Sequence, residues 1–346
     1  MKLKFFIFYN IFIIIIFFVL IEIFFKLYFH QTKKFNCYAK VEDIRKYTNQ
    51  INCNFKEKYF EKEKPTFYFT NKDGIRVGKE KIDISDKEKI FFVGDSFTFG
   101  YLSNYEFTYP YVAIQKINNK SQKKFIEKNY GVNGYQIDEV LYLINQSEIK
   151  NTKNYVIYGL TPNDLFDINE KKLNIEKKYN LVDNLKILID KLDLISIKYF
   201  SSKILNNEKI YTKLYKKRGS KSGYLSHNSS IEWDKKYEIF EEKINKLPKE
   251  IRNRLIITII PQQIQIKLLQ QNLINEGLAF DRKILDICLN LKIKCISKTL
   301  ELAKIHDYKT HFVIDGHLIP EANRTYGELI SKDLIQKLNV EKNNND

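Results

Sequence analysis

The sequence predicts an α/β protein in which a parallel sheet is covered by helices on both faces. Strand-like runs occur at 90–93, 125–130, 155–159 and 255–260, and helical patterns lie between them. Strand and helix that alternate in this way are typical of a three-layer α/β/α sheet. With 346 residues and 44% apolar content, the chain suits a membrane anchor followed by one large domain with its own core.

The amino terminus predicts a membrane helix. Residues 5–25 form an apolar run of 21 residues in which only Asn10 and Glu22 are strongly polar. That length spans a bilayer as a helix. A cleaved signal peptide has a shorter apolar run and a small-residue cleavage site, and neither is present. We therefore expect residues 1–30 to be an uncleaved transmembrane signal anchor.

The orientation of this anchor follows less directly from the charges. Lysines flank both ends of the apolar run and nearly balance: Lys2 and Lys4 before it, and Lys26, Lys33 and Lys34 after it. The short N-terminal tail and the cysteines that follow the run favour a cytoplasmic amino end. We expect a single-pass protein whose bulk lies outside the cytoplasm, in the periplasm.

Three further regions complete the expected organisation. Residues 31–64 are polar and lysine-rich, which indicates a stalk. Residues 65–340 hold the α/β domain, with further strands at 66–70 and 293–296 and helices at 136–145, 264–291 and from 319 onwards. Helices with proline in the first turn are expected near Pro110 and Pro320. Residues 170–250 predict a mostly helical insertion, either packing bulk or a wall of the substrate site.

Charge and cysteine content limit the possible partners. The net charge is +16, but only seven of the basic residues are arginine, and the lysines are scattered singly. Such scatter argues against a nucleic-acid site, so we expect no nucleic-acid partner. Cys37 and Cys53 are placed to form a disulfide, whereas Cys288 and Cys295 suit buried thiols as well as a bond. The oligomeric state is left open.

Polar residues follow the predicted strands where a parallel sheet gathers its loops. Ser96 comes three residues after the predicted strand at 90–93, and Gly134 and Asn163 follow the next two strands. Asp315 and His317 precede the last helix. A serine needs an imidazole as base, a carboxylate to orient that imidazole, and fixed donors for an oxyanion. Ser96, His317 and Asp315 supply the first three, and the N–H groups of Ser96 and Gly134 with the Asn163 amide supply the donors.

Several short blocks of the sequence resemble the SGNH/GDSL hydrolase superfamily, in particular its membrane-anchored members. The blocks are 94–100 (GDSFTFG), 129–135 (NYGVNGY), 159–164 (GLTPND), 315–317 (DGH) and the lead-in 71–76 (NKDGIR). The resemblance covers about 66–335 without the insertion. It implies a flavodoxin-like fold, Ser96 as the nucleophile, Gly134 and Asn163 as oxyanion donors, and no cofactor or metal.

One spacing departs from that family. In that family two residues usually stand between the Asp and the His, whereas Gly316 alone stands between Asp315 and His317. Either Asp315 still orients the imidazole, or a backbone carbonyl does so. The set His306, His311, Asp315 and His317 matches no metal signature. Asp95 and Asp164 are expected to make loop hydrogen bonds.

The expected activity is therefore hydrolysis of an ester by a membrane-anchored serine esterase. The family suggests an O-acyl group, for instance O-acetyl, on an envelope glycan as substrate. Two alternatives remain at this point. One is an O-acyltransferase that uses the same residues on a cell-surface polysaccharide. The other is a catalytically inactive glycan-binding or assembly protein with the same fold.

Overall fold

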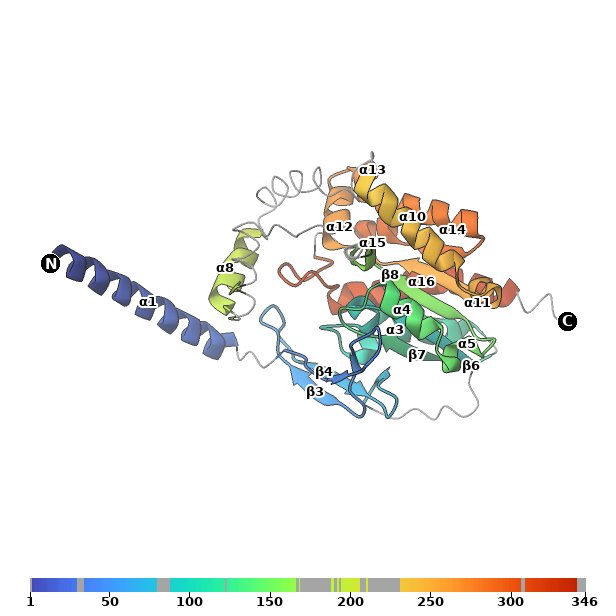
Figure 1. Ribbon diagram of the computed structural model, residues 1–346, viewed down its shortest axis with the longest axis horizontal. Coiled ribbons are helices and arrows are strands. Elements are labelled where there is room, and N and C mark those ends of the chain that lie inside the picture. The colour runs from blue at the N-terminus through green and yellow to red at the C-terminus, as the bar shows by residue number, and fades with distance from the viewer. Residues whose placement is uncertain are drawn as a thin grey trace.

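The computed structural model describes residues 2–29, 34–79, 88–121, 123–165, 168, 188–189, 192, 194–205, 210, 231–305 and 309–340. An eight-stranded sheet lies between two layers of helices, and one long helix projects from this body (Figure 1). The strands are β1 (Tyr38–Lys40), β2 (Tyr47–Asn49), β3 (Asn54–Glu57), β4 (Thr66–Thr70), β5 (Arg76–Val77), β6 (Glu88–Gly94), β7 (Phe125–Gly131), β8 (Val156–Leu160), β9 (Leu255–Ile259) and β10 (Lys294–Ser297).

The helices fill the segments between these strands as the sequence predicts. They are α1 (Lys2–Phe29), α2 (Ser96–Phe99), α3 (Tyr109–Lys120), α4 (Ile137–Ile144), α5 (Ser147–Lys150), α8 (Ile195–Leu205), α10 (Ile231–Asn245), α11 (Lys249–Arg254), α12 (Gln263–Gln270), α13 (Ile274–Gly277), α14 (Ala279–Leu291), α15 (Thr299–Ile305) and α16 (Pro320–Val340), with short 3-10 turns at Tyr105–Phe107 and Pro162–Leu165.

The strand order confirms the predicted fold class. The sheet runs β10-β9-β8-β6-β7-β5-β4-β3, and β6 to β10 pair in parallel. Counted along the chain, these five parallel strands have the flavodoxin-like order 2-1-3-4-5. In such a sheet the loops at the carboxyl ends of the central strands meet around the point where the strand order reverses. Here that point lies between β6 and β8.

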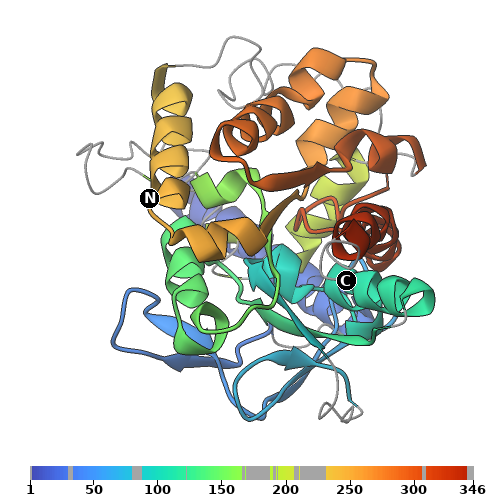
Figure 2. The ribbon, with the colours of Figure 1, turned by 90° about the vertical axis from the view of Figure 1, so that its right-hand side faces the viewer.

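The central parallel strands β6, β8 and β9 are buried on both faces over most of their length, as their apolar sequences predict. Alternate residues of β6 face opposite layers: Phe91 packs with α4, α10 and α14, whereas Phe92 packs with α3 and α16. Both side chains have no exposed surface. Figure 2 shows helices on both sides of the sheet. The two cores fix β6, and therefore fix the position of the loop that carries Ser96.

The segment expected as a stalk belongs instead to the folded body. Strand β3 pairs antiparallel with β4, and β4 continues through β5 to β7, so residues 54–57 complete the eight-stranded sheet. Strands β1 and β2 form a separate antiparallel pair. Phe35 packs in a small core with Tyr68 and Phe99. The expectation of a stalk over 31–64 is wrong for 35–57, because short polar strands with a few buried aromatics carry little signal in the sequence.

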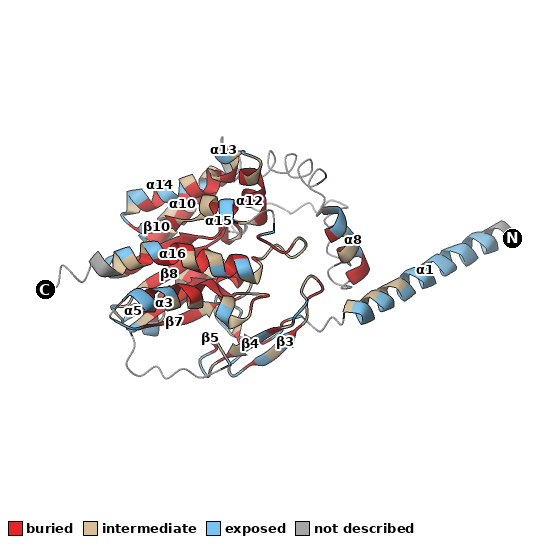
Figure 3. Cartoon of the chain, turned by 180° about the vertical axis from the view of Figure 1, so that it is seen from behind, coloured by how far each residue is buried: buried red, intermediate tan, exposed pale blue. Residues whose placement is uncertain are grey.

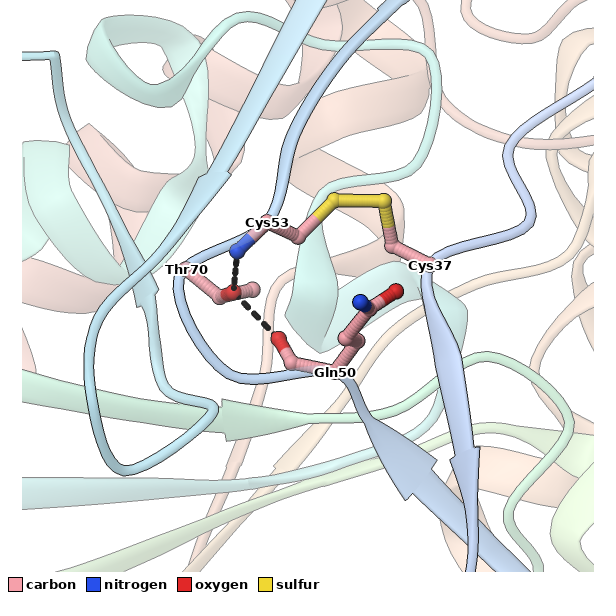
Figure 4. The surroundings of a disulfide bond; sticks show 4 residues. All are labelled: Cys37, Gln50, Cys53 and Thr70. Carbon is pink, nitrogen blue, oxygen red and sulfur yellow. Dashed lines mark hydrogen bonds between the residues drawn. A yellow bond between two sulfur atoms is a disulfide. The ribbon is translucent and has the colours of Figure 1, made fainter.

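All four cysteines form disulfides, Cys37 with Cys53 and Cys288 with Cys295. Around the first bond, the N–H of Cys53 donates to the Thr70 hydroxyl (2.9 Å), and that hydroxyl donates to the Gln50 carbonyl (Figure 4). This disulfide therefore joins the residue before β1 to the residue before β3 of the main sheet, and Thr70 of β4 holds the second of these by a hydrogen bond. The second bond links the end of α14 to β10.

Removal of the Cys37–Cys53 bond is expected to cost more stability than removal of the Cys288–Cys295 bond. The first joins residues 16 apart and the second joins residues 7 apart. Loop-closure entropy then gives about 3 kcal/mol for the first and about 2 kcal/mol for the second. Urea unfolding of the two double Cys→Ser variants measures both values, and the shorter loop is the matched control. An equal or smaller loss for the Cys37–Cys53 pair would contradict this ranking.

Helix α1 is long and apolar enough over Phe5–Phe29 to cross a membrane. Its side chains are exposed along most of its length (Figure 3). The predicted insertion over 170–250 falls largely outside the described residues. Within it, α8 lies beside the end of α1, whereas α10 packs Trp233, Tyr237 and Phe240 into the core that α4 and α14 form on one face of the sheet. At least α10 is therefore part of the domain.

Candidate active site

Three glycines lie level with one another at or next to the last residue of the central strands, and the loops that follow place the predicted site residues at one edge of the sheet. Gly94 of β6 is level with Gly131 of β7 and with Gly159 of β8. The loops that follow carry Ser96, Gly134 and Asn163 as predicted. Their convergence is a direct result of parallel pairing, because each strand leaves the sheet at the same edge.

Ser96 begins the one-turn helix α2, and the Asp95 side chain caps that turn. The Phe97 N–H donates to Asp95 Oδ1 at 2.9 Å. This is the loop hydrogen bond expected of Asp95. Gly100 ends the turn in the left-handed conformation. Ser96 is 8% exposed.

A buried arginine packs against the last residue of α2. Arg76, from the end of the 71–76 block, has its guanidinium 4.6 Å from the Tyr68 ring centroid and 5.0 Å from that of Phe99. It donates to the carbonyls of Phe67 (2.9 Å) and Ser103 (3.2 Å). Burial lowers the pKa of Arg76 to about 10, with the charges of Tyr68 and Glu106 acting in the opposite direction. The cation–π contacts and carbonyls stabilise the charge in place of a carboxylate.

The structure brings Ser96, His317 and Asp315 into one hydrogen-bonded series. His317 Nε2 lies 2.6 Å from Ser96 Oγ, and His317 Nδ1 is hydrogen-bonded to Asp315 Oδ1. The same Asp315 oxygen accepts the His317 backbone N–H at 3.3 Å. The His317 and Asp315 side chains are 18% and 20% exposed, so solvent reaches one side of the series.

The one-residue spacing between Asp315 and His317 works because the residue between them is glycine. Gly316 has φ +88°, in the left-handed region that favours glycine, and an added Cβ would meet no atom within 4 Å. This backbone conformation lets the Asp315 side chain turn back onto the following imidazole. The Gly316 N–H donates to the Phe312 carbonyl at 2.9 Å, and this bond closes the turn.

The charges of the pair shift both pKa values away from their ordinary ranges. Burial opposes the charged imidazolium, but the Asp315 charge and hydrogen bond prevail and raise the pKa of His317. Burial likewise opposes the Asp315 carboxylate, yet His317 lowers the pKa of Asp315. Asp315 therefore remains ionised beside an imidazole that binds a proton more readily than a free one.

Two aromatic residues hold the imidazole on two sides. The His317 ring centroid lies 4.6 Å from that of Phe97 and 5.1 Å from that of Tyr101. Tyr101 in turn donates to Glu57 Oε1 at 2.9 Å. Glu57 also accepts from Tyr68 at 3.0 Å. Glu57 belongs to β3, in the segment that was expected to be a stalk, and it holds the Tyr101 ring that packs against the imidazole. No motif in the sequence marks Glu57.

Asn163 is held by hydrogen bonds through both ends of its amide. Its Nδ2 donates to Asp95 Oδ2 at 2.9 Å, and its Oδ1 accepts from Gln262 at 3.2 Å and from the Thr161 hydroxyl. Asp164 accepts from the Thr161 N–H at 3.0 Å and from Tyr158 at 3.1 Å, as expected of a loop residue. Asn163 is therefore hydrogen-bonded directly to Asp95, the residue that caps α2, and the orientation of its side-chain amide is fixed.

Gly134 occupies a turn that two tyrosines from the amino-terminal segment hold in place. Its φ is +80°, and an added Cβ would lie 2.5 Å from the Tyr47 hydroxyl. Tyr47 donates to the Asn133 carbonyl at 2.9 Å, and the Asn133 amide donates to the Tyr38 hydroxyl at 2.9 Å. Only glycine suits this position. Tyr38 and Tyr47 were not predicted, because hydroxyl contacts between distant segments leave no pattern in the sequence.

His311 has a structural role. It is 3% exposed, with Nε2 3.0 Å from the Pro261 carbonyl and Nδ1 2.8 Å from the Thr310 hydroxyl. Burial lowers its pKa to about 3, so the ring is neutral. Nε2 therefore donates to the carbonyl, and Nδ1 accepts from Thr310. His306 lies outside the described residues. Within those residues no group of three His, Cys, Asp or Glu side chains is placed to hold a metal ion.

Five parallel strands in the flavodoxin-like order between two helix layers place the chain in the three-layer α/β/α class. No family model and no curated protein matches it. Solved structures similar to it include the psychrotrophic esterase EstA from Pseudoalteromonas sp., with 11% identity and a TM-score of 0.41 over 73% of this chain and 100% of that one. The acetyl xylan esterase AlAXEase has 15% identity and a TM-score of 0.40, over 71% and 98%. The lipase/acylhydrolase from Enterococcus faecalis has 11% identity and 0.39, over 72% and 96%. TM-scores this low carry no argument about function, which therefore depends on the residues of the chain itself.

Proposed function

We propose that this chain is a membrane-anchored serine esterase of the SGNH type. The observation that carries the proposal is the hydrogen-bonded series of Ser96, His317 and Asp315, which come from two loops 219 to 221 residues apart. A serine, a histidine and a carboxylate in this order form the arrangement that activates a hydroxyl for attack on a carbonyl. The domain at 65–340, together with the segment before it, carries this site.

In the proposed reaction Ser96 Oγ attacks the ester carbonyl while His317 Nε2 accepts the hydroxyl proton. The His317 Nδ1–H donates to the Asp315 carboxylate, which holds the ring in the required tautomer and stabilises the imidazolium. The same proton then passes from Nε2 to the departing alcohol. Water next attacks the acyl-serine with His317 again as base. This step releases the acid and restores Ser96.

Three donors are proposed for the oxyanion: the backbone N–H groups of Ser96 and Gly134 and the side-chain amide of Asn163. Their loops leave adjacent strands at the same level. Donors fixed before the reaction need no reorganisation when the negative charge develops. The bonds that Thr161 and Gln262 make to Asn163 support such a fixed orientation.

The proposed setting is the outer face of a membrane. Helix α1 supplies an apolar length that suits a single-pass anchor. The two disulfides suit an oxidising compartment, which favours an extracytoplasmic domain. An O-acyl, for instance O-acetyl, group on an envelope glycan is the substrate we propose for a hydrolase so placed.

A fluorophosphonate probe tests the proposed function directly, because it reacts with an activated serine. We expect the full-length protein in detergent to be labelled at Ser96, and we expect the Ser96→Ala variant to remain unlabelled. Ser121→Ala, at the end of α3, is the matched control and should label like the wild type. Absence of wild-type labelling, or labelling that survives Ser96→Ala, would favour the inactive binding protein. Acyl-sugar product formed from an added sugar acceptor would instead favour acyl transfer.

Replacement of Asn163 by alanine is expected to lower kcat by about 10²- to 10³-fold, the usual effect of losing one oxyanion donor. KM should change little, because the contact forms in the transition state. Gln262→Ala removes a partner of Asn163 at 3.2 Å without removing the donor, so we expect a loss of about ten-fold at most. Steady-state hydrolysis of p-nitrophenyl acetate measures both. Equal losses in the two variants would contradict a direct role for the Asn163 amide.

A further inference from the structure

The apolar helix α1 contains one acidic residue, Glu22, and this residue caps a different helix. Its carboxylate accepts the Ile195 N–H at 2.7 Å, the Ser196 N–H at 3.1 Å and the Ser196 hydroxyl at 2.6 Å. These donors belong to the first turn of α8. The N–H groups at a helix start lack partners within the helix and favour a negative charge. Glu22 therefore fixes the start of α8 against α1.

Aromatic side chains join the two helices beyond this cap. The ring centroid of Phe25 lies 5.3 Å from Tyr199 and 5.5 Å from Phe200, and that of Phe29 lies 5.2 Å from Tyr199. Phe29 also contacts Phe60, at 6.1 Å, in the folded domain. Figures 1 and 3 both show α8 beside the domain end of α1. The contacts connect the carboxyl-terminal turns of the predicted membrane span to α8.

One side of α8 presents apolar residues to solvent. Ile197, Phe200 and Ile204 are 41%, 54% and 54% exposed. Their spacing of three and four residues places them on one side of the helix. Ile195 and Ser202, on the other side, are buried. Since Phe200 touches Phe25, the exposed stripe continues the apolar surface of α1. An exposed apolar stripe of this kind marks an interaction surface.

We propose that α8 lies on the membrane surface, with Ile197, Phe200 and Ile204 inserted among the lipids. A span of about 20 residues that starts at Phe5 reaches the far boundary near Phe24, so Glu22 and Phe25 lie at the lipid–water interface. Lys26 and Lys203 flank the junction and suit lipid headgroups, as is usual for interfacial helices. The chain then touches the bilayer through two helices, and the Glu22 cap fixes the angle between them.

A photoreactive lipid tests this proposal on the wild-type chain. The full-length protein is placed in nanodiscs of equal parts phosphatidylcholine and phosphatidylglycerol, with a diazirine in some acyl chains, and cross-linked residues are located by mass spectrometry. We expect cross-links on α8 at Ile197, Phe200 and Ile204 as well as on α1. Leu289 of α14, which is 77% exposed, is the matched apolar control and should remain unmodified. Cross-links on α1 alone, or equal labelling at Leu289, would overturn the proposal.

The role of Glu22 has a separate readout. In Glu22→Ala the start of α8 loses its cap, so we expect labelling of α8 to fall about five-fold while labelling of α1 is unchanged. Glu22→Gln keeps an acceptor oxygen and should fall less. Unchanged α1 labelling shows that the variants still insert. Full α8 labelling in Glu22→Ala would overturn the assignment of Glu22 as the residue that positions this helix.

Discussion

Replacement of Ser96 by alanine is expected to lower kcat for ester hydrolysis by about 10⁴- to 10⁶-fold, with little change in KM. The large factor follows from the loss of the nucleophile, since Ser96 Oγ is the hydroxyl that lies 2.6 Å from His317 Nε2. Residual activity would come from the oxyanion donors and from binding alone. Steady-state hydrolysis of p-nitrophenyl acetate by the full-length protein in detergent measures the effect.

The control for this experiment is Ser121→Ala, which removes a hydroxyl of the same kind at the end of α3. Its kcat should equal that of the wild type. Circular dichroism of both variants should show the same helix and sheet content. A Ser96→Ala variant that retains a tenth or more of the wild-type kcat would rule out Ser96 as the nucleophile.

The second large effect is expected for Asp315→Asn, with a loss of about 10³- to 10⁴-fold in kcat. An asparagine amide presents an N–H where the carboxylate accepts one, which favours the wrong tautomer of His317. It also removes the negative charge that stabilises the imidazolium. This variant decides whether Asp315 or a backbone carbonyl orients the imidazole. A loss below about ten-fold would favour a dyad of Ser96 and His317.

The pH profile supplies an independent check on the same pair. A general base must be neutral, so activity falls as the pH drops through the pKa of His317. Because Asp315 raises that pKa, the acidic limb of kcat/KM should have its midpoint above about 6.5, the ordinary value for histidine. Asp315→Asn removes the largest influence that raises the pKa, while burial of the ring still lowers it, so the limb should move to lower pH. A shift to higher pH would contradict the pairing.

The parallel core was predictable because its signals are local. Residues 90–93 and 255–259 are apolar runs that suit strands buried on both faces, and Pro110 and Pro320 mark helix starts that the structure confirms. Residues 35–57 were not predictable in the same way. Their strands are three or four residues long, and β3 gains its stability from pairing with β4 and from a disulfide, both of which depend on the folded arrangement.

The candidate site likewise contains residues that local sequence patterns predict and residues that only the folded arrangement brings together. Ser96, Gly134 and Asn163 follow strands and were therefore found from strand ends, whereas the reach of Asp315 to His317 depends on the φ of Gly316. Tyr47 and Glu57 touch the site through single hydroxyl or carboxylate contacts made across the fold. Such contacts impose no spacing on the sequence, and for this reason only the structure reveals them.

The pairing of β3 with β4 has a consequence for recombinant work. A truncation that starts at residue 65, where the sequence places the domain boundary, leaves the backbone N–H and C=O groups of β4 bare on one side. Strands left bare in this way recruit other copies and aggregate. The same cut removes Tyr47 from the Gly134 turn. A soluble version should therefore begin no later than Phe35, and an inert shorter fragment would say nothing about the chemistry of Ser96.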